Sequence, residues 1–587
     1  MSVPVSVWAP AAGEVVLHLP AAGTTAPMVA GEGGWWHSPE PLAPGTDYAY
    51  ALDGGAVLPD PRSPWQPHGV HGPSRTFDTG AHEWADAGWA GRSVLGAVVY
   101  ELHVGTFTAA GTLDAAVDRL DHLAALGVDM VELMPVAAFP GSAGWGYDGV
   151  ALYAVHDVYG GPAALQRFVD AAHARGIAVC LDVVYNHLGP SGNYLGAYGP
   201  YFTDAHETPW GSAVNLDGAD SAEVRAFIID NALRWLREFH LDALRLDAVH
   251  ALIDDSPTHI LAELSDAVAA LEGEVGRPLS LIAESDLNDA VMVTPTAEGG
   301  LGMTAQWADD LHHALHATVT GERHGYYVDF GPAEVLAKAL TDVFVHDGTF
   351  STFRDQVWGA PVPPDVDGRR FVVFAQDHDQ VGNRALGDRP SRVLAPGQLA
   401  ISAAVVLLGP GTPMLFMGEE WGATTPFQYF TDHSEAELAR SVSEGRRREF
   451  GTHGWAELYG RDIEVPDPQA PQTLAASRLD WDEPARPDNA RLLRFCTDLV
   501  RLRHTEADIA SGDRSATAVR VADDGTWLVL TRGAIDVVLN LAQTPARVPL
   551  EGVGEVLLEW EPVRGTDGPD GTWADVPGHG VAVLRRS

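Results

Sequence analysis

Positive charge is scarce in this sequence. The 587 residues include 37 lysines and arginines against 80 aspartates and glutamates, which gives a net charge of −43, and Lys338 is the only lysine. The acidic residues are spread along the chain and do not form a tail. Because a nucleic-acid-binding protein needs a basic face to neutralise phosphates, this charge balance disfavours nucleic acid as a partner.

Cysteines and long apolar runs are also scarce. Cys180 lies inside an apolar run and far along the chain from Cys496, so two reduced, buried thiols are favoured over a disulfide. The most apolar segment, residues 399–418, is interrupted by Gly-Pro-Gly, and the N-terminus has no basic segment followed by an apolar stretch. We therefore expect a cytoplasmic protein with no signal peptide, no membrane span and no membrane partner.

Three kinds of pattern divide the chain. Residues 1–90 form short alternating runs separated by glycine and proline, which predicts an N-terminal β-sandwich. Residues 91–507 alternate apolar strands with amphipathic helices, and this multidomain α/β pattern favours a closed (β/α)8 TIM barrel. Residues 508–587 return to short alternating runs, which predicts a C-terminal antiparallel β domain.

Polar and charged residues follow four of the predicted barrel strands. Active sites of such barrels are built where strands end, so residues directly after an apolar strand are the candidates for chemistry. In this sequence the strand-end segments are DVVYNH, LRLDAVH, IAES and AQDHDQ. They contribute Asp182, His187, Arg245, Asp247, His250, Glu284, His378 and Asp379.

Three of these carboxylates suit retaining glycoside hydrolysis. That reaction needs one ionised nucleophile and one protonated acid about 5 Å apart, which adjacent strands ending in Asp247 and Glu284 can supply. Arg245 is two residues before Asp247 and so shares its face of the strand, where it would keep the aspartate ionised. We expect burial and nearby negative charge to keep Glu284 protonated, and Asp379 to brace the sugar hydroxyls.

Two other interpretations of the same residues are weaker. A single aspartate after a strand more often caps a helix, but three acids with an arginine and two histidines, each after a buried run, are hard to explain as caps. A metal site would need a ligand pattern such as HxH or HExxH, and none occurs at these strand ends. We therefore expect no metal and no cofactor.

Taken together, the four strand-end segments resemble the signature regions of the α-amylase family of glycoside hydrolases. The β-sandwich of residues 1–90 then resembles the carbohydrate-binding accessory domain of the branching and debranching members of that family. The resemblance assigns the nucleophile to Asp247, the acid/base to Glu284 and the transition-state stabiliser to Asp379. It also implies that the following residues contact the reacting sugar: Tyr147 of the segment WGYDG, His187, Arg245 and His378. Asn186 matches a calcium ligand of amylases, although we expect activity without calcium.

Further segments, among them YELHVGTF and QWADDLHHALHATVTGERHGYYVDFG, resemble one branch of that family over nearly the whole chain. The implied reaction is retaining hydrolysis of the α-1,4 bond between a terminal trehalose and a malto-oligosaccharide. By resemblance, trehalose would be recognised by Asp286, Asp309, Asp310, His313 and Glu419. A branching enzyme that transfers glucan to a 6-hydroxyl is the alternative within the family, and a non-catalytic glucan-binding protein is the alternative outside it.

Two positions depart from the family pattern. Typical amylases have Lys-His at the third and fourth positions after the nucleophile, where this chain has His250 and Ala251. The side of the site that binds the leaving group is therefore built differently. Asp377 stands where the family usually has asparagine, which changes a hydrogen bond at the rim but no catalytic role.

Overall fold

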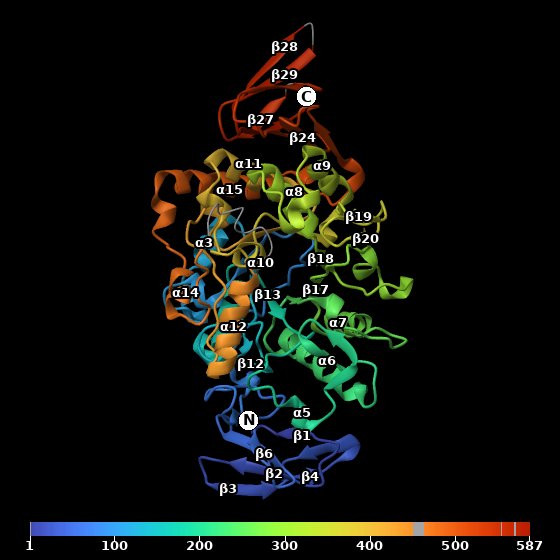
Figure 1. Ribbon diagram of the computed structural model, residues 1–587, viewed down its shortest axis with the longest axis vertical. Coiled ribbons are helices and arrows are strands. Elements are labelled where there is room, and N and C mark those ends of the chain that lie inside the picture. The colour runs from blue at the N-terminus through green and yellow to red at the C-terminus, as the bar shows by residue number, and fades with distance from the viewer. Residues whose placement is uncertain (1, 450–462, 553, 569–570, 587) are drawn as a thin grey trace.

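The computed structural model describes residues 2–449, 463–552, 554–568 and 571–586. In Figure 1 the chain extends from an N-terminal group of strands at the bottom, through a helix-covered middle, to a C-terminal group of strands at the top. Within the described residues, no helix combines the length and apolarity needed to span a bilayer. Cys180 and Cys496 are buried free thiols, which confirms that part of the sequence prediction.

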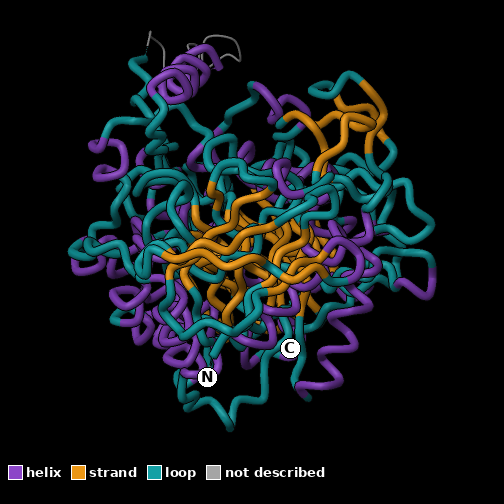
Figure 2. Tube along the Cα trace, turned by 90° about the horizontal axis from the view of Figure 1, so that it is seen from below, coloured by secondary structure: helices purple, strands orange, loops and turns teal. Residues whose placement is uncertain are grey.

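A closed barrel of eight parallel strands forms the middle of the molecule, which confirms the predicted fold class. In Figure 2, seen along the long axis, strands of the whole molecule lie near the centre and most helices lie around them. Inward-facing apolar side chains, such as Met130, Ile282 and Met414, fill the barrel. In chain order the strands are β9 (Val99–Leu102), β10 (Met130–Leu133), β13 (Ala178–Val183), β16 (Ala243–Leu246), β17 (Ser280–Ala283), β18 (Ala305–Trp307), β21 (Phe371–Phe374) and β22 (Thr412–Phe416).

Helices cover the outside of the barrel, as the alternating pattern predicts. The segment of residues 113–127 forms two short helices, α2 (Leu113–Val117) and α3 (Leu120–Leu126), and Thr112 caps the first of them. The other main helices are α4 (Gly161–His173), α6 (Ser221–Glu238), α7 (Ile260–Val275), α8 (Asp309–Thr320), α11 (Pro396–Leu408) and α15 (Pro487–Thr505).

The N-terminal strands form two antiparallel sheets that pack against α6. One sheet has the order β1-β5-β4, with strands at Ser6–Trp8, Trp35–His37 and Val29–Ala30. The other has the order β3-β2-β6-β7, with strands at Thr24–Pro27, Val15–Leu19, Asp47–Leu52 and Val57–Leu58. Trp35 Nε1 donates to Glu223 of α6 at 3.1 Å, and Arg62 donates to Asp230 of α6 at 2.8 Å. These contacts fix the sheets to the barrel.

The C-terminal strands form two further antiparallel sheets. The larger has the order β23-β24-β25-β30-β27, with strands at Thr517–Val521, Trp527–Arg532, Ile535–Asn540, Val581–Arg585 and Glu555–Glu559. The smaller contains β26 (Ala546–Leu550), β29 (Gly571–Val576) and β28 (Arg564–Gly568). The domain limits at residues 90 and 507 stay predictions, since they rest on the change of pattern in the sequence.

Two hairpins that the sequence pattern did not predict rise from the loops after the barrel strands. The first is β14 (Phe202–Thr208) with β15 (Gly211–Val214), and Trp210 lies at its turn. The second is β19 (Thr349–Ser351) with β20 (Gln356–Trp358). The first hairpin contributes to the cavity described next.

Candidate active site

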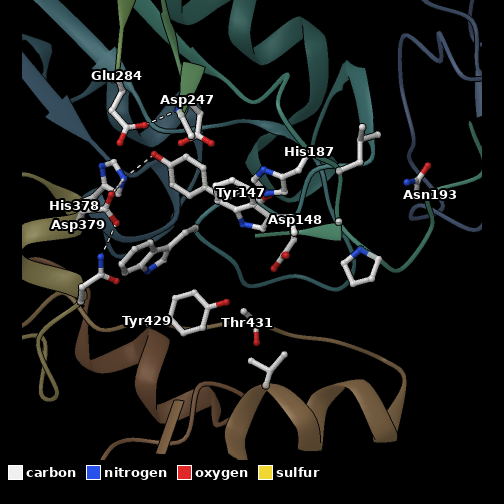
Figure 3. A pocket seen from close by; sticks show the side chains of 18 of the residues that line it. Tyr147, Asp148, His187, Asn193, Asp247, Glu284, His378, Asp379, Tyr429 and Thr431 are labelled. Carbon is white, nitrogen blue, oxygen red and sulfur yellow. Dashed lines mark hydrogen bonds and ion pairs between the residues drawn. The ribbon is translucent and has the colours of Figure 1, made fainter. Parts of the chain in front are cut away.

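Asp247, Glu284 and Asp379 line one cavity of about 920 Å3 at the carboxyl ends of the barrel strands. Asp247 directly follows β16 and Glu284 directly follows β17, and backbone hydrogen bonds to Val183 and Leu246 hold both residues in line with the strands. Asp379 is the second residue of α10 (His378–Gly382), which follows β21. Figure 3 shows Asp247 and Glu284 side by side, with His378 and Asp379 beside them. The structure therefore brings the three predicted acids together.

Arg245 lies beneath these acids and contacts two of them. Its side chain is fully buried, and Nη1 donates to Asp247 Oδ1 at 2.9 Å and to both oxygens of Asp182 at 2.9 and 3.0 Å. Nη2 lies 3.3 Å from Glu284 Oε2. The register of β13 against β16 explains the contact with Asp182, because it pairs Asp182 with Arg245. The guanidinium also lies 4.4 Å from the centre of the Trp307 ring, which limits its movement.

The groups around Glu284 act on its pKa in opposite directions. Burial raises the pKa of Glu284, Arg245 opposes that shift, and the charges of Asp247 and Asp379 add to it. The backbone N–H of Ala248 donates to Glu284 Oε2 at 2.6 Å and fixes its orientation. A carboxyl group that keeps its proton near neutral pH can act as a general acid. The electrostatics thus suit Glu284 to donate a proton.

Tyr147 connects Asp182 to His378 at the floor of the cavity. Its hydroxyl donates to Asp182 Oδ2 at 2.6 Å and lies 2.8 Å from His378 Nε2. The rings of Tyr147 and His378 are stacked, with centroids 5.1 Å apart. Burial raises the pKa of Asp182 to about 7, while Arg245 and Tyr147 favour its ionised form. His187 Nε2 contacts the backbone oxygen of Tyr147 at 3.0 Å, so this predicted residue also belongs to the site.

Of the residues predicted to lie on the trehalose side of the site, some line the cavity and others do not. His250 lines the cavity and its Nδ1 lies 3.4 Å from the backbone nitrogen of Asp286. Asp286 itself is exposed and forms an ion pair with Arg354. Asp309, at the start of α8, lies near Glu284: burial first, and then that neighbouring charge, raise its pKa well above the usual range. Neither Asp286 nor Asp309 lines the cavity, so their role in trehalose recognition stays a prediction.

Asp310, His313 and Glu419 do not line the cavity, and their role in trehalose recognition stays a prediction. Asp310 is buried, and its Oδ2 accepts hydrogen bonds from the backbone of residues 345 and 346 and from Asn288. Those contacts give Asp310 a role in holding a loop. Glu419 accepts from the backbone of Phe416 at 3.0 Å and lines a separate, water-sized cavity. His313 lies 3.9 Å from Asp310, behind the cavity wall, and packs against the Tyr326 and Phe330 rings.

Sequence reasoning missed most of the cavity wall beyond the catalytic acids. Trp210 is 49% exposed and stacks on His187, with ring centroids 4.6 Å apart and nearly parallel planes. Tyr429 and Thr431 lie across the cavity from Asp247 and Glu284 in Figure 3. The lining also includes Asp148, Asn193, Phe202, Asn383, Val442, Arg446 and Glu449. Aromatic residues at glycine- and proline-rich turns, such as Trp210 in TPWGS, were the only sequence signal for this wall.

The potential for metal binding is limited in the described part of the chain. His206, Asp217 and Asp255 form the one group there with enough ligands, and His206 already contacts Asp217 at 2.8 Å. None of the three lines the cavity. The Asn186 side chain is buried and makes no hydrogen bond to a described residue. The expectation of activity without metal stays a prediction.

Comparisons with known proteins identify the family. The sequence model of the α-amylase catalytic domain matches residues 73–198. The chain is 52% identical to a malto-oligosyltrehalose trehalohydrolase from Arthrobacter ramosus over 99% of both chains. It is 32% identical to a 1,4-α-glucan branching enzyme from Bacillus cereus over 67% of this chain and 62% of that one. A crystal structure titled putative α-amylase from Salmonella typhimurium superposes with a TM-score of 0.89 at 37% identity, covering 100% of this chain and 97% of that chain. These findings confirm the resemblance, and the chain belongs to the malto-oligosyltrehalose trehalohydrolases, a family of α-amylase-type glycoside hydrolases.

Proposed function

We propose that this enzyme hydrolyses the α-1,4 bond between a terminal trehalose and a malto-oligosaccharide and so releases trehalose. Family membership supports the choice of bond, and the arrangement of Asp247 and Glu284 around one buried arginine supports the chemistry. That arrangement is the observation that carries the assignment, because it places a carboxylate held by Arg245 and a carboxyl group with a raised pKa on one side of a cavity.

In the first step, the Asp247 carboxylate attacks the anomeric carbon of the glucose that precedes trehalose. Glu284 gives its proton to the glycosidic oxygen, and trehalose leaves as that bond breaks. Arg245 donates a hydrogen bond to Asp247 and so aims the attacking oxygen. Asp379 accepts hydrogen bonds from the sugar hydroxyls as positive charge develops on the ring. The product is an ester between Asp247 and the malto-oligosaccharide.

In the second step, Glu284, now a carboxylate, removes a proton from water as the water attacks the ester. The oligosaccharide leaves with the same anomeric configuration as the substrate, and both acids return to their starting state. Tyr147 and His378 form the floor on which the reacting sugar lies, and His187 with Trp210 forms an aromatic wall beside it. We propose a cytoplasmic location and no cofactor for the enzyme.

Incubation with maltopentaosyl-trehalose tests the proposal. We expect equimolar trehalose and maltopentaose, and proton NMR should show the α-anomer of maltopentaose first. Asp247→Asn and Glu284→Gln should each lower the rate by roughly a thousandfold or more. Asp118→Asn, the same change at an exposed position between α2 and α3, is the matched control and should keep the wild-type rate.

The alternatives predict different products. A branching enzyme would release no trehalose and would add α-1,6 branches to amylose, so that result would replace our proposal. Full hydrolysis by Asp247→Asn would show that the nucleophile is misassigned. A protein that binds malto-oligosaccharides but releases nothing, in wild type or variant, would be a glucan-binding protein.

A further inference from the structure

Glu101, on the first barrel strand, is a buried charged residue that the two steps above do not use. It pairs in register with Glu132 of β10 and with Phe416 of β22, and its side chain has no exposed surface. It is absent from the lining of the cavity, so it does not touch the sugar. Because a buried carboxylate is costly unless it is paired, its partner should reveal its role.

Both carboxylate oxygens of Glu101 contact His378. Oε2 accepts a hydrogen bond from the His378 backbone N–H at 3.0 Å, and Oε1 lies 2.5 Å from the ring nitrogen Nδ1. His378 begins α10, and the next residue is Asp379. One side chain therefore fixes both the imidazole ring and the backbone that carries the proposed stabiliser.

The contacts around His378 suit a proton on each of the two ring nitrogens. Tyr147 has one hydroxyl proton and donates it to Asp182, which also accepts from Arg245. The Tyr147 oxygen is then an acceptor for His378 Nε2, at 2.8 Å, so Nε2 carries a proton. Nδ1 faces the Glu101 carboxylate and carries the other proton. The ring is thus an imidazolium.

We propose that Glu101 is a positioning residue that holds His378 as an imidazolium in a fixed orientation, so that a positive charge stands beside Asp379 at the reacting sugar. His378 Nε2 lies 3.5 Å from Asp379 Oδ2, which places this charge within the catalytic group. The inference rests on the proposed function, because it assumes that the sugar lies against His378. It adds Glu101, a buried residue on the first barrel strand, to the residues that organise the active site.

The charged groups around His378 agree with this assignment. Burial lowers the pKa of His378, but the neighbouring carboxylates, Glu101 foremost, raise it well above the usual range. Burial, and then the charge of Glu101, raise the pKa of Glu132 well above its usual range, and its side chain forms no hydrogen bond to a described residue. The titratable groups that face the ring from its own helix and from the packed elements are Glu101, His103, Glu132, Tyr147, Asp182, Asp377 and Asp379.

The substitution Glu101→Gln tests the proposal, with Glu132→Gln as the matched control. If the new amide oxygen keeps the bond to the His378 backbone, the amide NH2 faces Nδ1 and disfavours a proton there. Glu132→Gln makes the same change on the neighbouring strand, at a side chain that forms no hydrogen bond to His378. Glu101→Asp retains the charge and serves as the conservative variant.

Two measurements test the effect of these substitutions on His378 and on catalysis. The first is nitrogen-15 NMR of the imidazoles in the full-length protein, with His378 assigned by its loss in His378→Asn. The second is the ratio of kcat/KM of the variant to that of wild type, from trehalose release between pH 5 and pH 8. For Glu101→Gln we expect one His378 nitrogen to lose its proton at pH 7 and the ratio to fall about tenfold or more from pH 5 to pH 8. Glu132→Gln should change neither, and Glu101→Asp should keep the imidazolium signal.

An unchanged His378 spectrum in Glu101→Gln, or a loss of activity of the same size at every pH, would overturn the proposal, because a merely structural carboxylate gives those results. If Glu101→Gln does not fold, a neutral His378 in the folded Glu101→Asp variant would overturn it equally. Failure of the wild-type enzyme to release trehalose would refute the proposed function alone. The NMR titration of His378 needs no substrate and would still decide the role of Glu101.

Discussion

Replacing Arg245 provides the strongest test of the site, since one guanidinium contacts Asp182, Asp247 and Glu284. Arg245→Lys keeps the positive charge but offers a compact ammonium in place of a planar fork. Arg245→Met keeps most of the length of the side chain and removes the charge. The pair of variants therefore separates the effect of geometry from that of charge.

The contacts set the expected size of each effect. A hydrogen bond from a charged donor contributes about 1.5–3 kcal/mol, and an ammonium that reaches two of the three carboxylates loses at least one such contact. Since about 1.4 kcal/mol is a factor of ten in rate, Arg245→Lys should lower kcat/KM for trehalose release by roughly 10- to 100-fold. Arg245→Met leaves buried acids without a counter-charge, which should lower the free energy of unfolding by about 3–5 kcal/mol and kcat/KM by more than about a thousandfold.

The pH dependence of kcat/KM in the Arg245 variants provides the result that could refute this reasoning. Arg245 lowers the pKa of Glu284, so its removal should raise that pKa further. Glu284 must be protonated in the first step, and the alkaline limb of kcat/KM should therefore move to higher pH in Arg245→Met and stay in place in Arg245→Lys. The assay is trehalose release at high enzyme concentration, with urea unfolding followed by circular dichroism. An alkaline limb that stays in place or moves to lower pH in Arg245→Met would refute this account of the acid.

Three further changes test the surroundings of the site. Trp210→Ala removes the ring stacked on His187 and should raise KM about 3- to 10-fold with little change in kcat, measured by initial rates. Asp310→Ala removes an acceptor of three hydrogen bonds and should lower the free energy of unfolding by about 2–4 kcal/mol in urea titrations, whereas an unchanged stability would contradict the loop role. Burial raises the pKa of Glu419 to about 8, so its contribution to stability is present below pH 4.5 and is lost as the pH rises towards 8. Glu419→Gln should therefore be more stable than wild type in urea at pH 8, and equal stability would argue against this burial effect.

The barrel and its three acids could be predicted from the sequence because their signals are local. Strands and helices alternate with clear periods, and Asp247 and Glu284 directly follow their strands. A residue after a buried parallel strand must emerge at the same end of the barrel as its neighbours. Sequence order alone therefore places these acids together.

The cavity wall could not be predicted because it depends on distant contacts. Trp210 reaches the site on a hairpin whose position is set by packing against the barrel. Asp309 and Asp310 are adjacent in the sequence, but one helical step turns their side chains about 100° apart. One therefore lies near Glu284, and the other turns to the loop at residues 345 and 346. No sequence pattern distinguishes two neighbouring acids in this way.

Asp247 and Glu284 differ in their contacts with Arg245. Asp247 receives a hydrogen bond from Arg245 at 2.9 Å, whereas Glu284 lies at 3.3 Å from the same group and is close to other negative charges. Burial raises the pKa of Glu284 and Arg245 opposes that shift, whereas Asp247 receives the direct hydrogen bond that aims it. His378, held by Glu101, supplies a second cation on the Asp379 side. Arg245 and His378 thus place positive charge beside the acids on two sides of the cavity, so that chemically similar carboxyl groups have different neighbours.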